Sequence, residues 1–323
     1  MNEFEFIASQ LKPLAGAFEG AMNLEDDAAV LTPEKGQEFV VTTDALTAGI
    51  HFFATDPPRL IAQKCLRVNL SDIAAMGAAP FCYSLALMLP EQTSQGWLSE
   101  FCDGLRADQE DHNVHLLGGD TTSTNGPLSV AITLIGTVPA GKALKRSTAR
   151  IDDDIWVTGT IGDSAMGLQA LKGALPSIDA TARDALVRRY HVPQPRNRIA
   201  PTLRDVATSA IDISDGLAAD LGHICTASGV GAQVSASKIP VSDHVLSLLN
   251  SSAMTFETIL SGGDDYELMF TANPNKYKQI NNLSSYLNLK ISKIGRLTAD
   301  LEVGFIDQDG SMLTFSSNGF RHF

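Results

Sequence analysis

The segment Asn69-Leu70-Ser71-Asp72-Ile73-Ala74-Ala75-Met76-Gly77-Ala78-Ala79-Pro80 decides the fold that we expect for this chain. Its apolar residues continue a helical spacing, which predicts a helix over residues 57–76. Gly77 is typical of the residue that follows a helix, and Pro80 cannot continue one. The apolar run at 82–89 then predicts a strand. The segment therefore predicts a helix that leads directly into a strand.

The polar residues of this segment indicate a second role, because a helix end does not account for Asn69, Ser71 and Asp72 among such small neighbours. Five further aspartate motifs lie beside strand-like or helix-like runs: Asp26-Asp27, Thr42-Thr43-Asp44, Gly119-Asp120-Thr121, Asp212-Ile213-Ser214-Asp215-Gly216 and Gly262-Gly263-Asp264-Asp265. Carboxylates gathered in this way repel one another unless a cation lies among them. Carboxylate, hydroxyl and carbonyl oxygens are the ligands that Mg²⁺ prefers. The motifs therefore predict a Mg²⁺-dependent enzyme that handles phosphates.

Two of these motifs also have simpler interpretations. Gly118-Gly119-Asp120 follows an apolar run at 114–117 and is common in tight turns, although its glycines would also let the backbone approach a phosphate. Ser214 or Asp215 could cap a helix at 216–228. That interpretation leaves Asp212 inside an apolar strand without a role, so we favour cation binding there.

One motif is rejected. The segment from Gly136 to Lys142 nearly matches the phosphate-binding P-loop, but Ala143 stands where the motif needs a hydroxyl for Mg²⁺. The residues that follow also leave no room for the helix that a P-loop requires.

Composition limits the class of protein. The 323 residues suffice for two domains, and the net charge of −13 argues against DNA or RNA as a partner. A nucleotide remains compatible with this charge, because bound Mg²⁺ reverses the local sign. The four cysteines have no metal-binding spacing and lie in apolar runs, which is typical of reduced thiols. With no long apolar segment and no basic secretory start, we expect a cytoplasmic protein away from membranes.

The order of the elements predicts an α+β protein with two domains, 1–150 and 151–323. Helices are expected at 4–12, 57–76, 96–112, 163–173, 180–190, 198–207 and 216–228. Strands are expected at 38–43, 82–89, 114–117, 128–138, 155–159, 209–213, 266–272, 291–297 and 302–306.

Taken in order, the aspartate motifs resemble those of the thiamine-monophosphate kinase family, within the superfamily of aminoimidazole ribonucleotide synthetase and selenophosphate synthetase. The resemblance extends over nearly the whole chain, from Asp26-Asp27 to the Gly262–Leu268 segment. It implies an N-terminal α/β domain that binds ATP and Mg²⁺ and whose mixed sheet pairs with that of a second subunit. It also implies a C-terminal α/β domain that completes the nucleotide and substrate site. The activity implied is transfer of the γ-phosphoryl group of ATP to thiamine monophosphate by a homodimer.

The resemblance also implies roles for individual residues. Several Mg²⁺ ions would be held by Asp27, Thr42, Thr43, Asp44, Asp72, Asp120, Asp212 and Asp215, with Asp44, Asp72 and Asp120 converging on the metal. ATP would contact Gly119, Asp120, Arg146 and Ser214. Thiamine monophosphate would contact His51, Asp264 and Phe320. No residue is assigned as a catalytic acid or base.

Other readings of the same motifs are another ATP-using member of the superfamily, a Mg²⁺-dependent phosphatase, and a nucleotide-binding protein without catalysis. A selenophosphate synthetase would need a reactive cysteine near its N-terminus, whereas the first cysteine here is Cys65, inside a predicted helix. The hydrogenase-maturation relative would end in cysteine, whereas this chain ends in Phe323.

Overall fold

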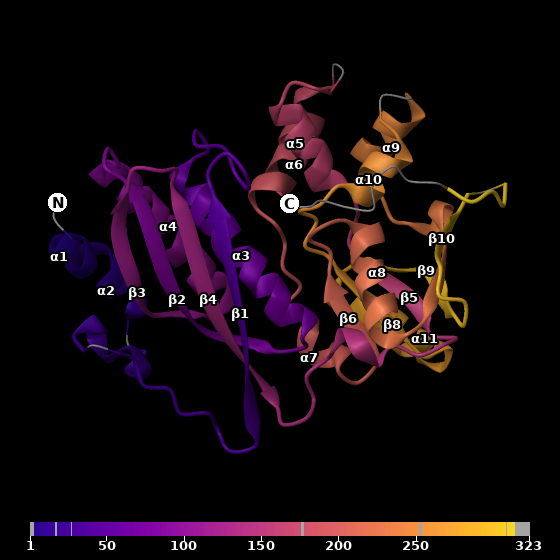
Figure 1. Ribbon diagram of the computed structural model, residues 1–323, viewed down its shortest axis with the longest axis horizontal. Coiled ribbons are helices and arrows are strands. Elements are labelled where there is room, and N and C mark those ends of the chain that lie inside the picture. Colours follow the sequence, from indigo (N-terminus) through magenta and orange to yellow (C-terminus); the bar gives the residue numbers. More distant parts are fainter. Residues whose placement is uncertain are drawn as a thin grey trace. The chain divides into compact units, whose positions relative to one another are not determined.

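The first half of the chain builds a four-stranded sheet in the order β1-β4-β2-β3 (Figure 1). The computed structural model describes residues 3–16, 18–26, 28–175, 178–251, 254–307 and 309–313. The strands of this sheet are β1 (Gln37–Thr47), β2 (Ala79–Pro90), β3 (His115–Thr124) and β4 (Ser129–Pro139). β4 is antiparallel to β1 and β2, whereas β2 and β3 are parallel. Parallel neighbours need a crossover connection, and α4 (Gln95–His112) supplies it.

The two faces of this sheet differ sharply in burial. Val130, Ile132 and Leu134 of β4 are fully buried on one face, which α3 (Pro58–Ala75) and α4 cover (Figure 1). We call this the inner face. On the opposite, outer face, Val41 is 59% exposed. Because successive strand residues point to opposite faces, the register between strands fixes which side chains share each face.

The N-terminal segment is helical, as predicted for residues 4–12. It consists of α1 (Glu3–Phe6), the π-helix η1 (Ile7–Leu11) and α2 (Lys12–Ala15), followed by the 3₁₀ segment η2 (Glu19–Leu24).

The second half builds a six-stranded sheet in the order β10-β7-β9-β5-β8-β6. Only the β10–β7 pair is parallel. The strands are β5 (Asp154–Thr158), β6 (Ser209–Asp212), β7 (Gly231–Ser235), β8 (Leu268–Ala272), β9 (Ile291–Thr298) and β10 (Val303–Ile306). The α-helices are α5 (Asp163–Leu171), α6 (Ala180–His191), α7 (Ala200–Leu203), α8 (Leu217–Ser228), α9 (Asp243–Asn250), α10 (Phe256–Ser261) and α11 (Tyr277–Leu287). Three-residue 3₁₀ turns lie at η3 (Arg146–Thr148), η4 (Ala236–Lys238) and η5 (Pro274–Lys276).

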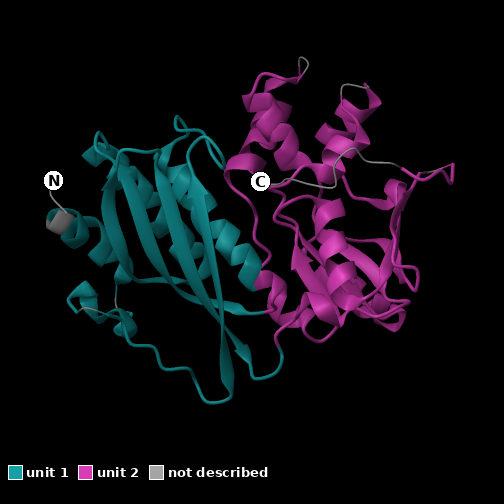
Figure 2. Cartoon of the chain, in the orientation of Figure 1, with its two compact units in different colours: residues 1–73, 78–142 teal, residues 74–77, 143–323 magenta. Residues whose placement is uncertain are grey.

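Apolar residues cover both faces of this second sheet. Ile155 and Val157 of β5 pack into a core with α5, α8, α9 and α10, whereas Trp156 between them packs into a second core with α7 and α11. The chain thus forms two compact units, residues 1–73 with 78–142 and residues 74–77 with 143–323 (Figure 2). Both combine helices with a sheet that contains parallel and antiparallel pairs, which confirms the mixed helix-and-strand class predicted from the sequence.

Two predictions about the chain as a whole can be compared with the structure. All four cysteines are buried and free, as their apolar surroundings predict. Within the described ranges, no helix combines the length and the hydropathy that a bilayer crossing requires.

Candidate active site

Strand β1 presents the Thr42-Thr43-Asp44 motif on two different faces of the first sheet. Thr42 pairs with the buried Leu134 and Asp44 with the buried Ile132, so both side chains lie on the inner face. There the Thr42 hydroxyl donates a hydrogen bond of 2.5 Å to the Asp72 carboxylate of α3. The structure therefore brings Thr42, Asp44 and Asp72 together, as the sequence predicts.

Asp44 and Asp72 bring two carboxylates together in a partly buried place. Burial raises the pKa of Asp44 from 3.8 to about 7, and the charge of Asp72 and a hydrogen bond with it add to that rise. The backbone N–H of Asp44 meanwhile donates to the Asn69 side chain at 3.1 Å, which fixes the strand against α3. Half-buried carboxylates whose charged forms repel are suited to a divalent cation, and the Thr42 hydroxyl adds a hard oxygen. The donor set thus fits Mg²⁺.

Thr43 and Asp120 do not join this group within one chain. Thr43 is exposed on the outer face, where its hydroxyl lies 2.9 Å from that of Thr133. Asp120 pairs with Ala86, whose position in the register also belongs to the outer face. Three strand spacings separate β1 from β3, about 14 Å across the sheet. The expected convergence of Asp120 with Asp44 and Asp72 is therefore not formed inside the first unit.

Gly119 and Asp120 lie within β3, so the tight turn considered for Gly118-Gly119-Asp120 is wrong. The strand continues through the two glycines because Gly119 packs against the backbone of β2. A Cβ added there would lie 1.8 Å from the Leu85 carbonyl oxygen. No side chain other than that of glycine fits at this point of the strand.

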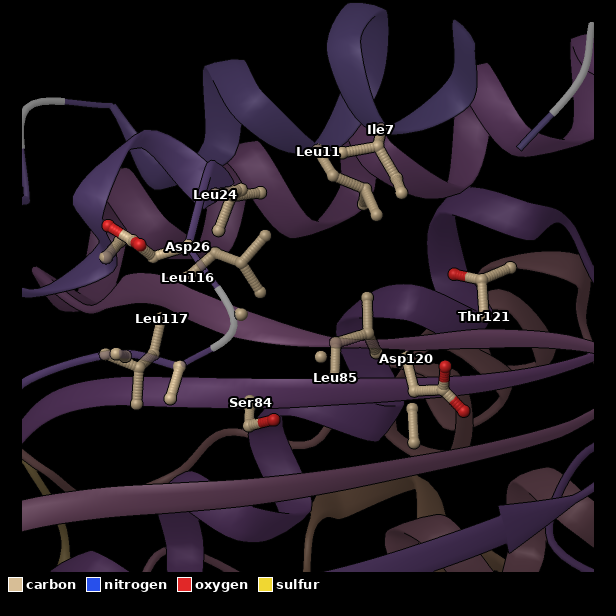
Figure 3. Close-up of a pocket in the computed structure, with 16 residues that line it drawn as sticks. Ile7, Leu11, Leu24, Asp26, Ser84, Leu85, Leu116, Leu117, Asp120 and Thr121 are labelled. Carbon is tan, nitrogen blue, oxygen red and sulfur yellow. The ribbon is translucent and has the colours of Figure 1, made fainter. Parts of the chain in front are cut away.

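Gly119 and Asp120 also line a cavity of about 530 Å³ in the first unit (Figure 3). Its apolar wall includes Leu11, Leu24 and Leu116, from the N-terminal helical segment and from β3. The cavity thus combines an apolar lining with glycine backbone and carboxylates.

The Asp212–Gly216 motif connects β6 to α8 in the second unit. Asp212 is the last residue of β6 and is only 3% exposed. The residue that caps α8 is Gly216, so the alternative in which Ser214 or Asp215 caps this helix is wrong. The backbone N–H groups of Ser214 and Asp215 instead donate to the Asp220 carboxylate, at 3.0 and 3.1 Å.

Asp220 is a residue that the sequence analysis missed. Burial raises its pKa to about 7, and the neighbouring charge of Asp215 adds to the rise. The positive charge of Arg146 acts in the opposite direction on the same pKa, which places Arg146 beside this loop. The Arg146 carbonyl accepts hydrogen bonds from the hydroxyls of Ser228 at 2.8 Å and Ser209 at 3.2 Å. The sequence did contain a signal for Asp220, because it is a single aspartate among the mostly apolar residues at the start of α8.

His51 lies in a tight turn after β1. Its backbone N–H donates to the Thr47 carbonyl at 3.0 Å, and its ring Nδ1 accepts from the Thr47 N–H at 3.0 Å. Since Nδ1 is the acceptor, the proton of the neutral ring is on Nε2, where it can be donated. Phe52 next to it is buried and holds the turn in the core.

Asp264 lies in a strained loop before β8. Asp264 and Tyr266 have φ angles of 68° and 50°, in the left-handed region that costs a residue with a side chain about 1 kcal/mol or more. The Tyr266 hydroxyl donates to the Asp264 carboxylate at 3.1 Å. Backbone strain of this kind is maintained only where the surroundings enforce it.

Glu267, at the end of this loop, is anchored by a buried network of hydrogen bonds. The sequence analysis did not identify it as a site residue. Its fully buried carboxylate accepts hydrogen bonds from Thr158 at 2.7 Å, Arg189 at 3.0 Å and Arg196 Nε at 2.6 Å, and Arg196 Nη2 is a further close partner. Asp265 is also fully buried and accepts from the Gly162 N–H at 2.9 Å. The partners of Glu267 lie far away in the sequence, so spacing gave no signal of them. Two predicted site residues, Asp27 and Phe320, lie outside the described residues.

Comparison with known proteins decides the family. The description "AIR synthase related protein, N-terminal domain" matches residues 25–138, and the corresponding C-terminal domain matches residues 150–308. The thiamine-monophosphate kinase of Salmonella typhimurium is 43% identical over 298 residues, which cover 92% of this chain and 90% of that protein. The chain belongs to the thiamine-monophosphate kinase family.

Solved structures of this family have the same fold. The thiamine-monophosphate kinase from Stenotrophomonas maltophilia K279a is 41% identical and superposes with a TM-score of 0.82, covering 90% of this chain and 91% of that one. AaThiL complexed with AMPPCP and TMP is 28% identical, with a TM-score of 0.79 and coverage of 99% and 97%. The aspartate motifs described above therefore lie in a fold that this thiamine-monophosphate kinase family member shares with relatives of known structure.

Proposed function

We propose that this chain transfers the γ-phosphoryl group of ATP to thiamine monophosphate, giving thiamine diphosphate and ADP. The family relationship supports the reaction, and AaThiL has been solved with AMPPCP and TMP. The observation that carries the proposal to the site is Asp44 beside Asp72: burial, and next the charge of Asp72, raises the pKa of Asp44 to about 7, and a bound cation would offset both effects. Phosphoryl transfer between two anions requires such neutralisation.

Mg²⁺ would be held by Asp44, Asp72 and the Thr42 hydroxyl in the first unit, with Asp27 as a further proposed ligand. In the second unit we propose Asp212 and Asp215. When bound, Mg²⁺ neutralises the phosphate oxygens and offsets the charge that develops during transfer. Before substrate arrives, the Thr42 hydroxyl holds the Asp72 carboxylate, and Asn69 holds the backbone of Asp44.

For ATP, we propose contacts to Gly119 and Asp120 in the first unit, which line the cavity, and to Arg146 and Ser214 in the second. Ser214 presents its backbone beside Asp220, and the Arg146 backbone is held by two serine hydroxyls. From this anchored backbone, the Arg146 guanidinium can pair with a phosphate group. In the domain division predicted from the sequence, 1–150 with Arg146 would bind ATP and Mg²⁺, and 151–323 would complete the nucleotide and substrate site.

For thiamine monophosphate, we propose contacts to His51, Asp264 and Phe320. The Nε2–H of His51 can donate to an anion, and the Asp264 carboxylate can pair with the cationic thiamine ring. The acceptor oxygen belongs to a phosphate with a second pKa of about 6, so it is largely ionised at neutral pH. Transfer therefore needs positioning and charge neutralisation, and no general base.

We also propose a homodimer, which the outer face of the first sheet supports. That face is rich in small or exposed side chains, including Val41, Thr43 and Ala45, which suit a second flat sheet. It also carries Asp120, about 14 Å from Asp44 and on the opposite face. β1 and β3 are the two edge strands of the sheet, so we propose that pairing of the sheets brings Asp120 past the edge of the partner's β1 to the metal site there. Light scattering should give about twice the 34.4 kDa mass of one chain, and a mass near 34.4 kDa at micromolar concentration would contradict the dimer.

Mixing two inactive variants tests the shared site. A dimer of one Asp72→Asn and one Asp120→Asn subunit regains one intact site only if Asp120 acts across the interface. Statistical mixing then restores about a quarter of wild-type turnover. If the mixture stays inactive although heterodimers form, Asp120 acts within its own subunit.

The reaction itself is tested by following ADP. ADP should form from ATP only when thiamine monophosphate is added, and thiamine diphosphate should form in equal amount. Steady release of inorganic phosphate without the acceptor would indicate a phosphatase instead. We also propose a cytoplasmic location, supported by the four buried, free thiols.

A further inference from the structure

A lysine is buried in the middle of α3. Lys64 is only 1% exposed, although lysine is almost never fully buried without a partner. Removing an ammonium group from water costs several kcal/mol. A leucine or methionine would fill the same space without this cost. We therefore expect the ammonium charge of Lys64, or its N–H donors, to have a specific role.

One identified use is a hydrogen bond to the turn that carries His51. Lys64 Nζ donates to the His51 carbonyl oxygen at 2.9 Å. The imidazole of the same residue is held from the other side by the Thr47 N–H. His51 is therefore fixed at both its backbone and its ring, and the ring is oriented with its proton on Nε2.

The spacing along α3 separates Lys64 from Asp72 of the proposed metal site. Lys64 and Asp72 are eight residues apart on α3, which is about 12 Å along the helix axis. Side chains in a helix also lean toward its N-terminus, so the Lys64 ammonium extends away from Asp72.

We infer that Lys64 is a positioning residue for His51, and through it for the phosphate acceptor. This inference rests on the proposed function, because it takes His51 to contact thiamine monophosphate. Lys64 touches no reacting atom. Its part is to hold the backbone of the turn that carries His51.

The test compares Lys64→Met, His51→Ala and the double variant, with ADP formation as the readout. Loss of a charged hydrogen bond should raise the KM for thiamine monophosphate about tenfold in Lys64→Met. The KM for ATP and the Mg²⁺ requirement should stay at their wild-type values. In the His51→Ala background, Lys64→Met should raise the KM for thiamine monophosphate no further.

Arg67→Met is the matched control. Arg67 is a second buried cation of α3, but its partner is Asp108 of α4, at 2.8 Å. It should lower the unfolding temperature and leave the KM for thiamine monophosphate unchanged. If Arg67→Met raises this KM as much as Lys64→Met does, general destabilisation explains both effects and the inference is wrong.

Nitrogen-15 NMR of the histidine rings gives a readout independent of activity. The His51 signal, assigned by its absence from His51→Ala among the seven histidines, should show Nδ1 without a proton in the wild type. In Lys64→Met this signature should shift toward an average of both tautomers. If Lys64→Met does not fold, Lys64→Gln is measured instead. Its uncharged amide is one bond shorter than lysine and cannot keep the 2.9 Å contact to the His51 carbonyl, so it should raise the same KM alone.

The possible outcomes distinguish failure of the proposed function from failure of the role proposed for Lys64. A wild type that makes no ADP in response to thiamine monophosphate refutes the proposed function. A normal wild type with a raised KM in His51→Ala but not in Lys64→Met refutes only the role of Lys64. Equal rises in the KM for ATP and for thiamine monophosphate in Lys64→Met also overturn that role.

Discussion

Asp72→Asn should stabilise the protein when metal is absent and inactivate it when metal is present. The substitution removes one negative charge from the inner face, where Asp44 and Asp72 interact. Asparagine keeps a carbonyl oxygen in place, so the hydrogen bond from the Thr42 hydroxyl can persist. The change therefore tests charge with little change of shape.

The magnitude follows from Asp44. A pKa raised from 3.8 to about 7 corresponds to about 4 kcal/mol of destabilisation at pH values well above 7. The folded form binds the proton more tightly than the unfolded form, so metal-free stability falls as the pH rises from about 4 to about 7. Burial is the largest cause and Asp72 the next, so Asp72→Asn should recover on the order of 1–2 kcal/mol at pH 8. That gain is about 2–6 °C in unfolding temperature.

Thermal unfolding with a chelator at pH 5 and pH 8 measures this gain, and titration with Mg²⁺ measures its reversal. Mg²⁺ should raise the unfolding temperature of the wild type and have much less effect on Asp72→Asn. ADP formation should fall at least about a hundredfold, as for other lost electrostatic groups in active sites. Asp103→Asn is the matched control, because Asp103 is an exposed acid of α4, paired only at the surface with Arg106.

Two results would refute the reasoning. Near-wild-type turnover in Asp72→Asn would show that Asp72 is an ordinary acid of α3. A loss of metal-free stability at pH 8, larger than that of Asp103→Asn, would show that the Asp44–Asp72 pair stabilises the fold rather than straining it.

Three further substitutions probe the strands and the strained loop. Gly119→Ala should cost about 2–3 kcal/mol and raise the KM for ATP, because its Cβ would overlap the carbonyl of β2. Gly118→Ala, with no heavy atom within 4 Å of its Cβ, should stay within about 0.5 kcal/mol of the wild type in denaturant unfolding. Glu267→Gln should cost about 3 kcal/mol by leaving its arginines without a countercharge. It should also raise the KM for thiamine monophosphate by displacing Asp264, and an unchanged KM in a destabilised Glu267→Gln would contradict that link.

Strong periodicity made part of the fold predictable. The helix expected at 57–76 is α3 (Pro58–Ala75), and the strand expected at 128–138 is β4 (Ser129–Pro139). In both, one apolar face is buried over its whole length, so local pattern and tertiary packing agree. By contrast, β7 and the helices α9, α10 and α11 were not predicted. β7 has only five residues and gives no clear pattern, whereas α11 does carry apolar residues at a helical spacing, Ile280, Leu283 and Leu287, which the prediction overlooked.

The candidate site was predictable only where the residues that form it belong to one recognisable sequence pattern. Because successive strand residues alternate between the two faces of a sheet, the sequence alone could have placed Thr43 on the face opposite to Thr42 and Asp44. The glycines before Asp120 looked like a turn because only the close packing against β2 explains them. Glu267 was out of reach, since its arginines are 71 and 78 residues away and meet it only in the folded unit.

The second unit also joins the proposed nucleotide and acceptor loops into one structure. The Asp264 N–H donates to the Ser214 carbonyl at 2.8 Å, and the Tyr266 N–H donates to the Ile213 carbonyl at 2.8 Å. Gly263 allows this contact, because a Cβ there would lie 2.3 Å from the Ser214 oxygen. The loop that presents Asp264 therefore rests directly on the loop that presents Ser214. Displacing either backbone breaks hydrogen bonds of the other, so two motifs that are individually weak in the sequence act as a single rigid element in the fold.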